Sequence, residues 1–347
     1  MAEASEDKGD HGPAQRQTQA GIHEFIFGAP NAEREALLRF WAVLGFEPVD
    51  EGRLGPEAAG LAYAHRQGLT SVRLRHRGCD TFNTGLVRLQ FWDQLRNEGL
   101  DDTRPLVVGS RWMGLYTQDI LQLRDSLTNS EQQREWALWV SPLVNAPLSH
   151  PPAEVDFYRP FVGLRETLVF GRRFRLAFIQ RAGFDRPGFG TIDDRLAFRN
   201  TEGSHANIVQ PAGRFDSAFY KRVFGFETAP YGDAHDSGTE QTTIEALALR
   251  PGETFHIERT RALDCPSGLL QIYSSYLAGD DRRDRSRPGC GNLCAYSVKV
   301  RDLDRLCAEV GDAGGVVSDR FEDEFGEASV CFDGPDGYAW VAVADVG

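Results

Sequence analysis

The residues of this sequence best suited to chemistry are a histidine and two tyrosines in its second half. His205 begins an apolar, strand-like run, and Tyr273 and Tyr296 lie in two later runs of similar character. Imidazole titrates near neutral pH, and a phenol can donate a hydrogen bond to a developing oxyanion. If the fold buries His205 close to either tyrosine, the pair could abstract a proton next to a carbonyl group, with isomerisation or elimination to follow.

Each of these residues also has a purely structural explanation. A histidine at the start of a strand can be a hydrogen-bonded structural residue, and tyrosines commonly fill the cores of sheets. A second histidine, His23, opens an earlier strand-like run in the same way. The recurrence favours a functional role, although common ancestry of the two segments would also explain it.

A repeated unit positions these histidines. Residues 204–233 predict a strand, an amphipathic helix and a second strand. Gly225 is expected to end the helix, because glycine readily takes the left-handed turn that closes one. Residues 21–49 repeat this design, with His23 entering the strand and Gly45 after the helix. Such self-similarity indicates an internal structural repeat.

This unit resembles the vicinal oxygen chelate superfamily, which includes glyoxalase I, extradiol dioxygenases and bleomycin-resistance proteins. The resemblance is carried by the histidine that opens the strand, by Phe219 and Tyr220 on the helix, and by the Gly-Phe pair that ends it. Residues 332–338 are similar to the turn that precedes the last strand of such modules. The resemblance covers residues 21–345 and implies an α+β fold. Four βαβββ modules would pair into two glyoxalase-like domains with cupped mixed sheets.

The modules divide the chain into two expected domains. Modules 1 and 2 are assigned to domain 1, residues 21–182, and modules 3 and 4 to domain 2, residues 204–347. Residues 183–203 would link them. Residues 1–20 are polar and charged, which predicts a disordered leader with no signal peptide or membrane anchor. If modules paired across chains instead, the protein would be a homodimer, and this possibility stays open.

In this superfamily each module offers a metal ion two positions, one near the start of its first strand and one on its last strand. The resemblance places His205 and Gln271 at the positions of module 3. It places Ala295 and Val341 at those of module 4, where neither side chain can coordinate. Two neutral ligands hold a hard divalent cation weakly. We therefore expect no metal cofactor; if one divalent ion is bound, His205 and Gln271 are its expected ligands.

In domain 1 the module 1 positions hold His23 and Arg88. A guanidinium at such a position argues against a cation. A buried Arg88 needs a partner, which could be a substrate carboxylate held bidentately or an internal Asp or Glu.

The expected function is that of a glyoxalase-like lyase or isomerase, acting by acid/base chemistry on a small aromatic organic substrate. One alternative is a binding protein that sequesters a small molecule without turnover, and another is a metal-dependent dioxygenase or glyoxalase-type enzyme. The expected catalytic residues are His205, Tyr273 and Tyr296. The expected substrate-binding residues are Gln271, Tyr231, His256, Trp340, His23 and Arg88.

Composition limits the partners of the chain. Its 347 residues, 41% of them hydrophobic and 11% aromatic, can fill the cores of two domains. Acidic residues outnumber basic ones by 51 to 38, and the net charge of −13 disfavours nucleic acid and anionic membranes. No apolar run is long enough to span a bilayer. We expect a cytoplasmic protein whose six irregularly spaced cysteines are free thiols.

Overall fold

The computed structural model describes most of the chain. The expected leader, residues 1–20, lies outside the described residues. These residues are 21–79, 84–101, 104–129, 134–147, 161–184, 189–211, 217–229, 234–235, 241–262, 265, 268–275 and 281–345.

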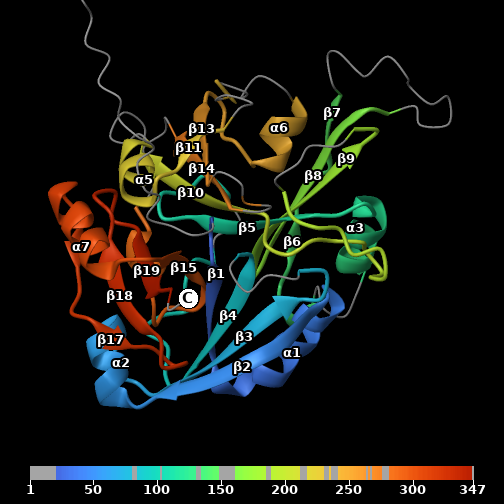
Figure 1. Cartoon of the computed structure of the whole chain (residues 1–347). Helices are drawn as coiled ribbons and strands as arrows, with labels where there is room; N and C mark the ends of the chain where they lie inside the picture. The colour runs from blue at the N-terminus through green and yellow to red at the C-terminus, as the bar shows by residue number, and fades with distance from the viewer. Residues whose placement is uncertain are drawn as a thin grey trace, which may run out of the picture.

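The first of two sheets joins the two ends of the described chain. Its strands follow the order β16-β18-β19-β15-β1-β4-β3-β2, and β17 pairs with β18. In Figure 1 it occupies the lower half, where blue N-terminal and red C-terminal strands lie together. Its strands are β1 (Glu24–Pro30), β2 (Phe46–Leu54), β3 (Leu69–His76), β4 (Leu86–Trp92), β15 (Asn292–Val300), β16 (Val316–Val317), β17 (Phe321–Glu322), β18 (Ala328–Asp333) and β19 (Ala339–Ala344).

The second sheet is formed by the middle of the chain. Its order is β11-β13-β14-β10-β5-β9-β8-β6, with β12 on β13 and β7 on β8. Its green to orange strands fill the upper half of Figure 1. They are β5 (Arg111–Tyr116), β6 (Trp139–Val140), β7 (Val144–Pro147), β8 (Gly163–Phe170), β9 (Arg175–Ala182), β10 (His205–Pro211), β11 (Glu227–Thr228), β12 (Ala234–His235), β13 (Phe255–Arg261) and β14 (Leu269–Ser275).

The predicted α+β fold of βαβββ modules in two mixed sheets is confirmed, but the predicted pairing of modules is wrong. The first strand of module 1 pairs with that of module 4, β1 antiparallel to β15. Modules 2 and 3 pair in the same way through β5 and β10. The first strand of every module presents the same kind of antiparallel edge, so its sequence does not specify which partner it takes. The two expected domains, residues 21–182 and 204–347, therefore do not correspond to the two sheets.

Both sheets and four helices share one hydrophobic core. One face of each sheet contributes side chains to it, among them Phe25 and Phe27 of β1 and Ala206 and Ile208 of β10. We call the opposite face of each sheet its inner face. The four helices of the shared core are α1 (Arg34–Val43), α3 (Ile120–Asn129), α5 (Ala218–Phe224) and α7 (Leu303–Asp312). The described chain also contains α2 (Pro56–Tyr63), α6 (Gln241–Ala246) and the 3-10 turns η1 (Asn31–Glu33) and η2 (Arg283–Arg285).

Gly225 and Gly45 lie at the helix ends for which they were predicted, and a third helix is capped by a side chain. Gly225 ends α5 with φ at 69°, and Gly45 follows α1 with φ at 80°. Asp302 caps α7, its side chain accepting a hydrogen bond from the backbone of Arg305 at 3.0 Å. Within the described residues, every helix is too short or too polar to cross a membrane. All six cysteines are free thiols.

Candidate functional site

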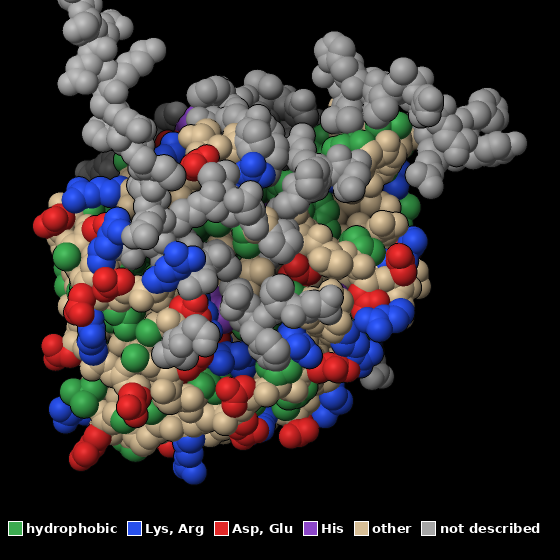
Figure 2. Space-filling model, viewed as in Figure 1, with side chains coloured by type: hydrophobic (Ala, Val, Ile, Leu, Met, Phe, Trp, Pro, Cys, Tyr) green, Lys and Arg blue, Asp and Glu red, His purple; other side chains and the backbone are tan. Residues whose placement is uncertain are grey.

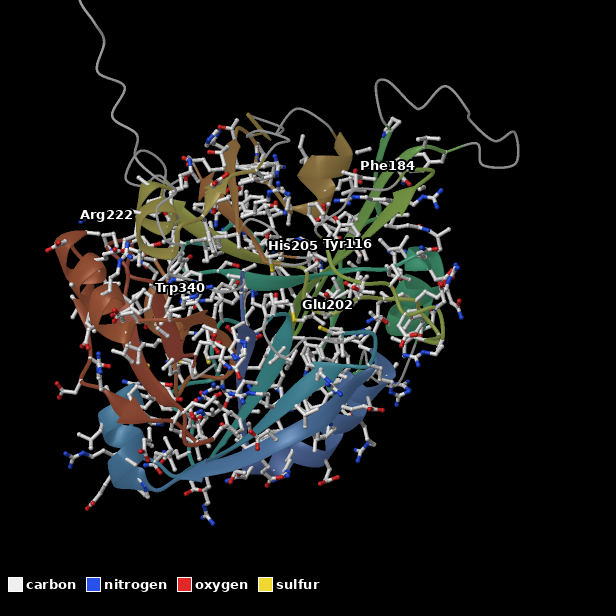
Figure 3. All side chains as sticks on the ribbon, in the orientation of Figure 1. Tyr116, Phe184, Glu202, His205, Arg222 and Trp340 are labelled. Carbon is white, nitrogen blue, oxygen red and sulfur yellow. The ribbon has the colours of Figure 1, made fainter. Side chains whose placement is uncertain are left out.

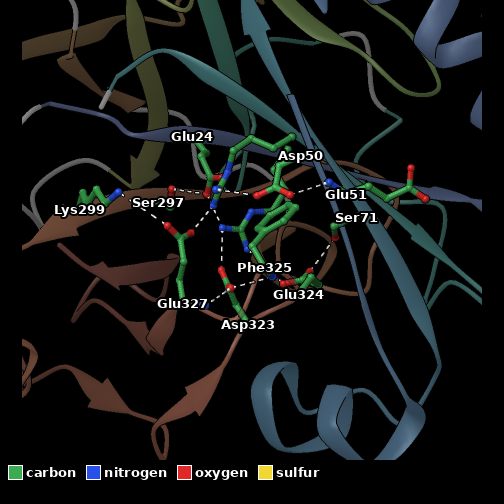
Figure 4. Close-up of polar contacts among 12 residues, drawn as sticks. Glu24, Asp50, Glu51, Ser71, Ser297, Lys299, Asp323, Glu324, Phe325 and Glu327 are labelled. Atoms are coloured by element: carbon green, nitrogen blue, oxygen red, sulfur yellow. Dashed lines mark hydrogen bonds and ion pairs between the residues drawn. The ribbon is translucent and has the colours of Figure 1, made fainter. Parts of the chain in front are cut away.

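The inner face of the first sheet is filled by a buried cluster of charges (Figure 4). Arg88 of β4 is fully buried and forms ion pairs with Glu24 of β1 at 2.6 Å and with Asp323 at 3.0 Å. A third ion pair joins Arg88 to Glu324 at 3.2 Å. Burial alone would lower the pKa of Arg88, but these carboxylates outweigh it, so that its pKa lies above the ordinary value. The internal carboxylates are thus the partners of Arg88.

The carboxylate of Glu324 is held from several sides by module 1. It accepts hydrogen bonds from four side chains of that module. They are Tyr63 at 2.8 Å, Ser71 at 2.7 Å, Gln90 at 2.8 Å and Arg88 at 3.2 Å. A hairpin loop of module 4 therefore closes the inner face of the sheet against module 1.

A second guanidinium completes this cluster. Arg73 of β3 pairs with Glu24 at 2.7 Å and with Glu327, and its guanidinium lies 4.0 Å from the ring centre of Phe325. Burial would raise the pKa of Glu24, but Arg88 and Arg73 hold it well below its usual range. Every carboxylate of the cluster therefore already has a cationic partner.

The cluster does not fit the metal ion that the resemblance implies. The position between Glu24, Asp323 and Glu324 is taken by the guanidinium of Arg88. A divalent cation would have to displace that fixed positive charge. In addition, Ala59 and Ala62 of α2 pack into this face. Within the described residues, the carboxylates of this face are therefore all engaged by cations.

The two histidines predicted to match each other do not match in the structure. The backbone N–H of His23 donates to Ser297 at 2.8 Å, and the residue that makes the same contact in module 3 is Ser204, which donates to Gly114 at 2.8 Å. His205 therefore corresponds to Glu24. Since side chains alternate along a strand, His23 points away from the inner face. Its predicted role in substrate binding loses its geometric basis.

The imidazole of His23 is buried without a hydrogen bond to the described residues. His23 is 1% exposed, and neither of its ring nitrogens has a hydrogen-bond partner there. Burial lowers the pKa of His23 from 6.5 to about 4. As pH falls below 6.5 the unfolded chain takes up this proton first, so stability is full above pH 6.5 and is lost toward pH 4.

We expect His23→Leu to keep or raise the thermal midpoint at pH 7, because it removes two unpartnered polar atoms. The difference in midpoint between pH 7 and pH 5 should shrink in the variant. Thermal melts at both values check this. A marked loss of stability at pH 7 would show instead that the imidazole has a partner.

On the second sheet, the inner face carries His205 at the start of β10. Figure 3 places it beside Tyr116 of β5, whose ring centre lies 6.4 Å from that of the imidazole. Gly114 lies directly opposite on β5, and a Cβ built there would fall 1.8 Å from Cε1 of His205. The imidazole thus lies over β5, in space that is open because residue 114 is a glycine and has no Cβ.

The tautomer of His205 follows from its hydrogen bonds. Its Nδ1 lies 2.9 Å from Oγ of Ser204, which also lies 3.0 Å from the carbonyl oxygen of Gly114. A carbonyl can only accept, so the single hydroxyl proton goes to Gly114 and Nδ1 donates to Ser204. Burial, followed by Arg181 and Arg259, lowers the pKa of His205 to about 3. At pH 7 the ring is neutral, and Nε2 carries a lone pair.

Gln271 and Tyr273 of β14 lie on the same face as His205. The hydroxyl of Tyr273 lies 3.4 Å from Oε1 of Gln271, and its ring packs 4.9 Å from that of Trp112. Gln271 is in register with Asn207 on one side and with Arg259 of β13 on the other. Burial raises the pKa of Tyr273, so it remains a proton donor at neutral pH.

A carboxylic acid absent from the predicted site completes this face. Glu166 of β8 is half-buried, and burial raises its pKa to about 7, opposed by the nearby charge of Arg259. Glu166 in turn raises the pKa of Tyr273. Leu168 and Phe170 of β8 share one apolar cluster with Phe255 and Ile257 of β13 although the two strands lie apart in the sheet order, so the sheet curls and brings its two sides together. No hydrogen bond to the carboxylate is found in the described part of the chain.

The sequence does contain a signal for Glu166, which lies in the alternation of β8. In β8, Leu164, Leu168 and Phe170 have the same alternation as Glu166, and all three pack on the inner face. A lone carboxylate in such an apolar series is a candidate for a raised pKa. Of the predicted residues, the structure brings together His205, Gln271 and Tyr273, and it adds Glu166 and Arg259.

Two residues predicted for this site lie in the shared core instead. Trp340 packs against Tyr296 at 5.4 Å between ring centres, far from His205 in Figure 3. The hydroxyl of Tyr296 donates to the carbonyl oxygen of Asn207 at 2.6 Å and ties the two sheets together. Strand alternation explains this position in the core. Ala295 and Val341 face the inner side of the first sheet, so the neighbouring residues Tyr296 and Trp340 face the shared core.

The other predicted residues are also elsewhere. His256 alternates with the inner-facing Phe255 and Ile257, so it lies on the opposite face of β13. Tyr231 lies outside the described residues. Ala295 and Val341, which the resemblance assigns to the same site as His205, belong to the first sheet. The strands facing His205 come from module 2.

The second sheet does not fit a metal ion better than the first. Across the described ranges, no three His, Cys, Asp or Glu side chains converge as a ligand set. Among the described residues, the charges that lower the pKa of His205 are those of Arg181 and Arg259, both positive. A divalent cation beside His205 would meet like charge, whereas an anion would be attracted.

Comparison with solved structures shows what this fold is like. Glyoxalase I from Zea mays matches with a TM-score of 0.55 and 12% identity, over 94% of this chain and 92% of that one. A candidate dioxygenase from Bacillus subtilis matches with a TM-score of 0.56 and 11% identity, over 96% and 87%. No protein-family model and no curated protein matches the sequence. At these identities the likeness establishes the shared fold.

Proposed function

From the premise that this chain has the four-module fold of the vicinal oxygen chelate superfamily, we propose that it is an acid/base enzyme. Its substrate would be a small aromatic molecule with an acidic C–H group next to a carbonyl, and its reaction an isomerisation or elimination. The site would be the inner face of the second sheet, working without a metal ion. The observation that supports this most is the carboxyl of Glu166, which lies in the apolar inner-facing series of β8 without a hydrogen bond within the described residues, where burial raises its pKa.

Glu166 is the group best suited to move the proton. A pKa near the working pH leaves about half of it ionised, which is the optimum for a general base. The carboxylate would take the proton from the substrate carbon, and the C–H electron pair would form the C=C bond of an enolate. The carbonyl π electrons would move to oxygen, which the amide N–H groups of Gln271 could meet as donors while Tyr273 holds Oε1 of that amide. Return of the proton to another carbon, or loss of a leaving group, completes the reaction.

The other residues would orient the substrate. With Nδ1 protonated and a pKa of about 3, His205 is a weak base, and its Nε2 serves better as a hydrogen-bond acceptor. Gln271 accepts from Tyr273 through Oε1, which leaves its amide N–H groups for a substrate oxygen. His205 would thereby position the substrate rather than abstract its proton.

Exchange of carbon-bound hydrogen for deuterium tests this proposal without knowledge of the product. The protein is incubated in D₂O with a panel of aryl ketones and aryl-substituted keto acids, and NMR follows loss of the C–H signal next to the carbonyl. We expect exchange by the wild type, and a fall of about 10²-fold or more in Glu166→Gln. Glu227→Gln, an exposed carboxylate on β11 of the same sheet, is the matched control.

Chelation decides the metal-dependent alternative. The exchange rate should be unchanged after treatment with EDTA. A rate that is lost with EDTA and restored by a divalent ion would contradict the proposal and favour a glyoxalase-type or dioxygenase-type site.

The second candidate function is sequestration of a small molecule without turnover. The low pKa of His205 favours it, because such an imidazole binds a donor well and transfers protons poorly. In that case the wild type would bind members of the panel without exchange, and Glu166→Gln would bind them equally well.

A further inference from the structure

We propose that the substrate of the second sheet is an amide whose N–H and C=O groups lie on the same side, as in a lactam, an imide or a primary amide. Oδ1 of Asn207 would accept a hydrogen bond from the N–H group, and the amide N–H groups of Gln271 would donate to the carbonyl oxygen. This inference rests on the proposed function in that it takes the inner face of the second sheet as the ligand site, and it names the carbonyl compound that binds there.

A buried acceptor without a partner is the first observation. Asn207 of β10 is 0% exposed, and its Oδ1 has no hydrogen-bond partner in the described part of the chain. The residues before and after it, Ala206 and Ile208, belong to the shared core, so the side chain of Asn207 lies on the inner face. Buried polar groups of folded proteins normally have a partner. An unpaired acceptor on the face that carries the site is therefore a place for a donor group of the substrate.

The orientation of this amide follows from the contact at its other end. Nδ2 of Asn207 lies 3.1 Å from the backbone carbonyl oxygen of Trp112 on β5. A carbonyl oxygen can only accept, so the atom that faces it must be the nitrogen. Oδ1 is the opposite end of the planar amide and is thereby turned away from β5. The other neighbour of β10 is β14, which carries Gln271 in register with Asn207.

Gln271 supplies the complementary group. Its Oε1 accepts from the hydroxyl of Tyr273 at 3.4 Å, so its N–H groups are the end that remains for a ligand. Register partners on neighbouring strands have their side chains on the same face, about 5 Å apart. The two amides nevertheless do not bond to each other, since Oδ1 of Asn207 has no partner. Within the described residues, an acceptor and a donor thus lie side by side, and a third group can bind both.

An amide with both groups on one side matches this pair. A lactam, an imide or a primary amide presents N–H and C=O next to each other, and Asn and Gln side chains recognise the adjacent donor and acceptor of a base edge in the same way. An open-chain secondary amide is trans and has the two groups on opposite sides. A ketone would pair with Gln271 and leave the acceptor of Asn207 unpaired.

Binding of three bicyclic probes to the full chain tests the inference. The lactam 2-oxindole has both groups, 2-indanone has CH₂ in place of the N–H group, and indoline lacks the carbonyl group. Titration calorimetry gives the dissociation constants. We expect 2-oxindole to bind at least about 10-fold more tightly than either of the others, because each of them leaves one of the two amides unpaired. Asn207→Leu should lower the affinity for 2-oxindole to that for 2-indanone. Gln271→Met should weaken the binding of both by a similar factor, because both have the carbonyl group.

Asn200→Leu is the matched control for the asparagine variant. Asn200 is also 0% exposed with an unpartnered Oδ1, and its Nδ2 donates to the backbone carbonyl oxygen of Leu44 at 2.8 Å. Leu44 belongs to the shared core, so the same chemical change is made away from the inner face. This variant should keep the preference for 2-oxindole.

Gln271→Met gives a second test should Asn207→Leu fail to fold, and unchanged affinity for both carbonyl probes in that variant would contradict the assignment. Equal affinity of the wild type for 2-oxindole and 2-indanone, as expected if only a water molecule joins the two amides, would overturn the inference. A preference that survives Asn207→Leu, or no binding of either carbonyl probe, would do the same. A preference for 2-oxindole without hydrogen exchange would overturn the proposed catalysis alone, and exchange of aryl ketones without this preference would overturn the amide assignment alone.

Discussion

Arg88→Met is expected to lower the free energy of unfolding by about 3–5 kcal/mol. The variant leaves Glu24, Asp323 and Glu324 buried without the guanidinium that joins them. An unpaired buried carboxylate costs far more than the pair contributes, because its hydration is not replaced. Urea unfolding at pH 7 measures the loss. The loss should shrink at pH 5, since protonation neutralises the carboxylates that remain.

An exposed ion pair between α1 and β2 of the same sheet provides the control. Arg34 and Glu51 form a bidentate pair, but their side chains are 31% and 53% exposed. Arg34→Met should cost less than about 1 kcal/mol. If Arg88→Met were as mild, the cluster in Figure 4 would not close the first sheet, and its inner face would have to be reconsidered as a ligand site.

Gly114→Ala is expected to lower hydrogen exchange by about 10²-fold while the protein remains folded. The added methyl group would fall 1.8 Å from Cε1 of His205, so the imidazole must leave its place across β5. The Cε1–H signal of His205 in the NMR spectrum should shift as well. These measurements together separate a displaced side chain from a general loss of structure.

Gly311→Ala is the corresponding control. Gly311 lies in α7, and a Cβ there meets no atom within 4 Å. The substitution should leave hydrogen exchange unchanged and stabilise the helix slightly. Full activity of Gly114→Ala would contradict the assignment of His205 to the site.

The modules could be predicted from the sequence because their signals are local. A helix that ends in a left-handed glycine recurs at Gly45 and Gly225, and each is followed by a strand. The pairing of modules could not be predicted, because it depends on contacts between strands that are far apart in sequence. Nothing in β1 distinguishes β15 from β5 as a partner.

The composition of the site was predictable in part. His205, Gln271 and Tyr273 do share a face, because the family pattern places them on neighbouring strands. The prediction that Tyr296 and Trp340 lie at the site was wrong. Ala295 and Val341 face the inner side of the first sheet, so strand alternation turns their neighbours Tyr296 and Trp340 to the shared core. The match between His23 and His205 failed by one residue, and in a strand a shift of one residue changes the face.

Glu166 and Arg259 could not be identified as neighbours from the sequence. They come from different modules and from strands on opposite sides of one sheet, and only its curvature brings their charges together. The surface gives no comparable signal, since Figure 2 shows acidic and basic side chains interspersed over the visible face.

Modules 2 and 3 pair with each other and lie between modules 1 and 4 in the sequence, which affects how the protein folds during synthesis. During synthesis, β10 follows β5 long before β15 is made. The second sheet can therefore form while the edge of β1 that pairs with β15 is still unpaired. A chain cut between the two central modules would yield two fragments, each holding half of both sheets. We expect neither fragment to fold alone, and the two would have to be co-expressed to form both sheets.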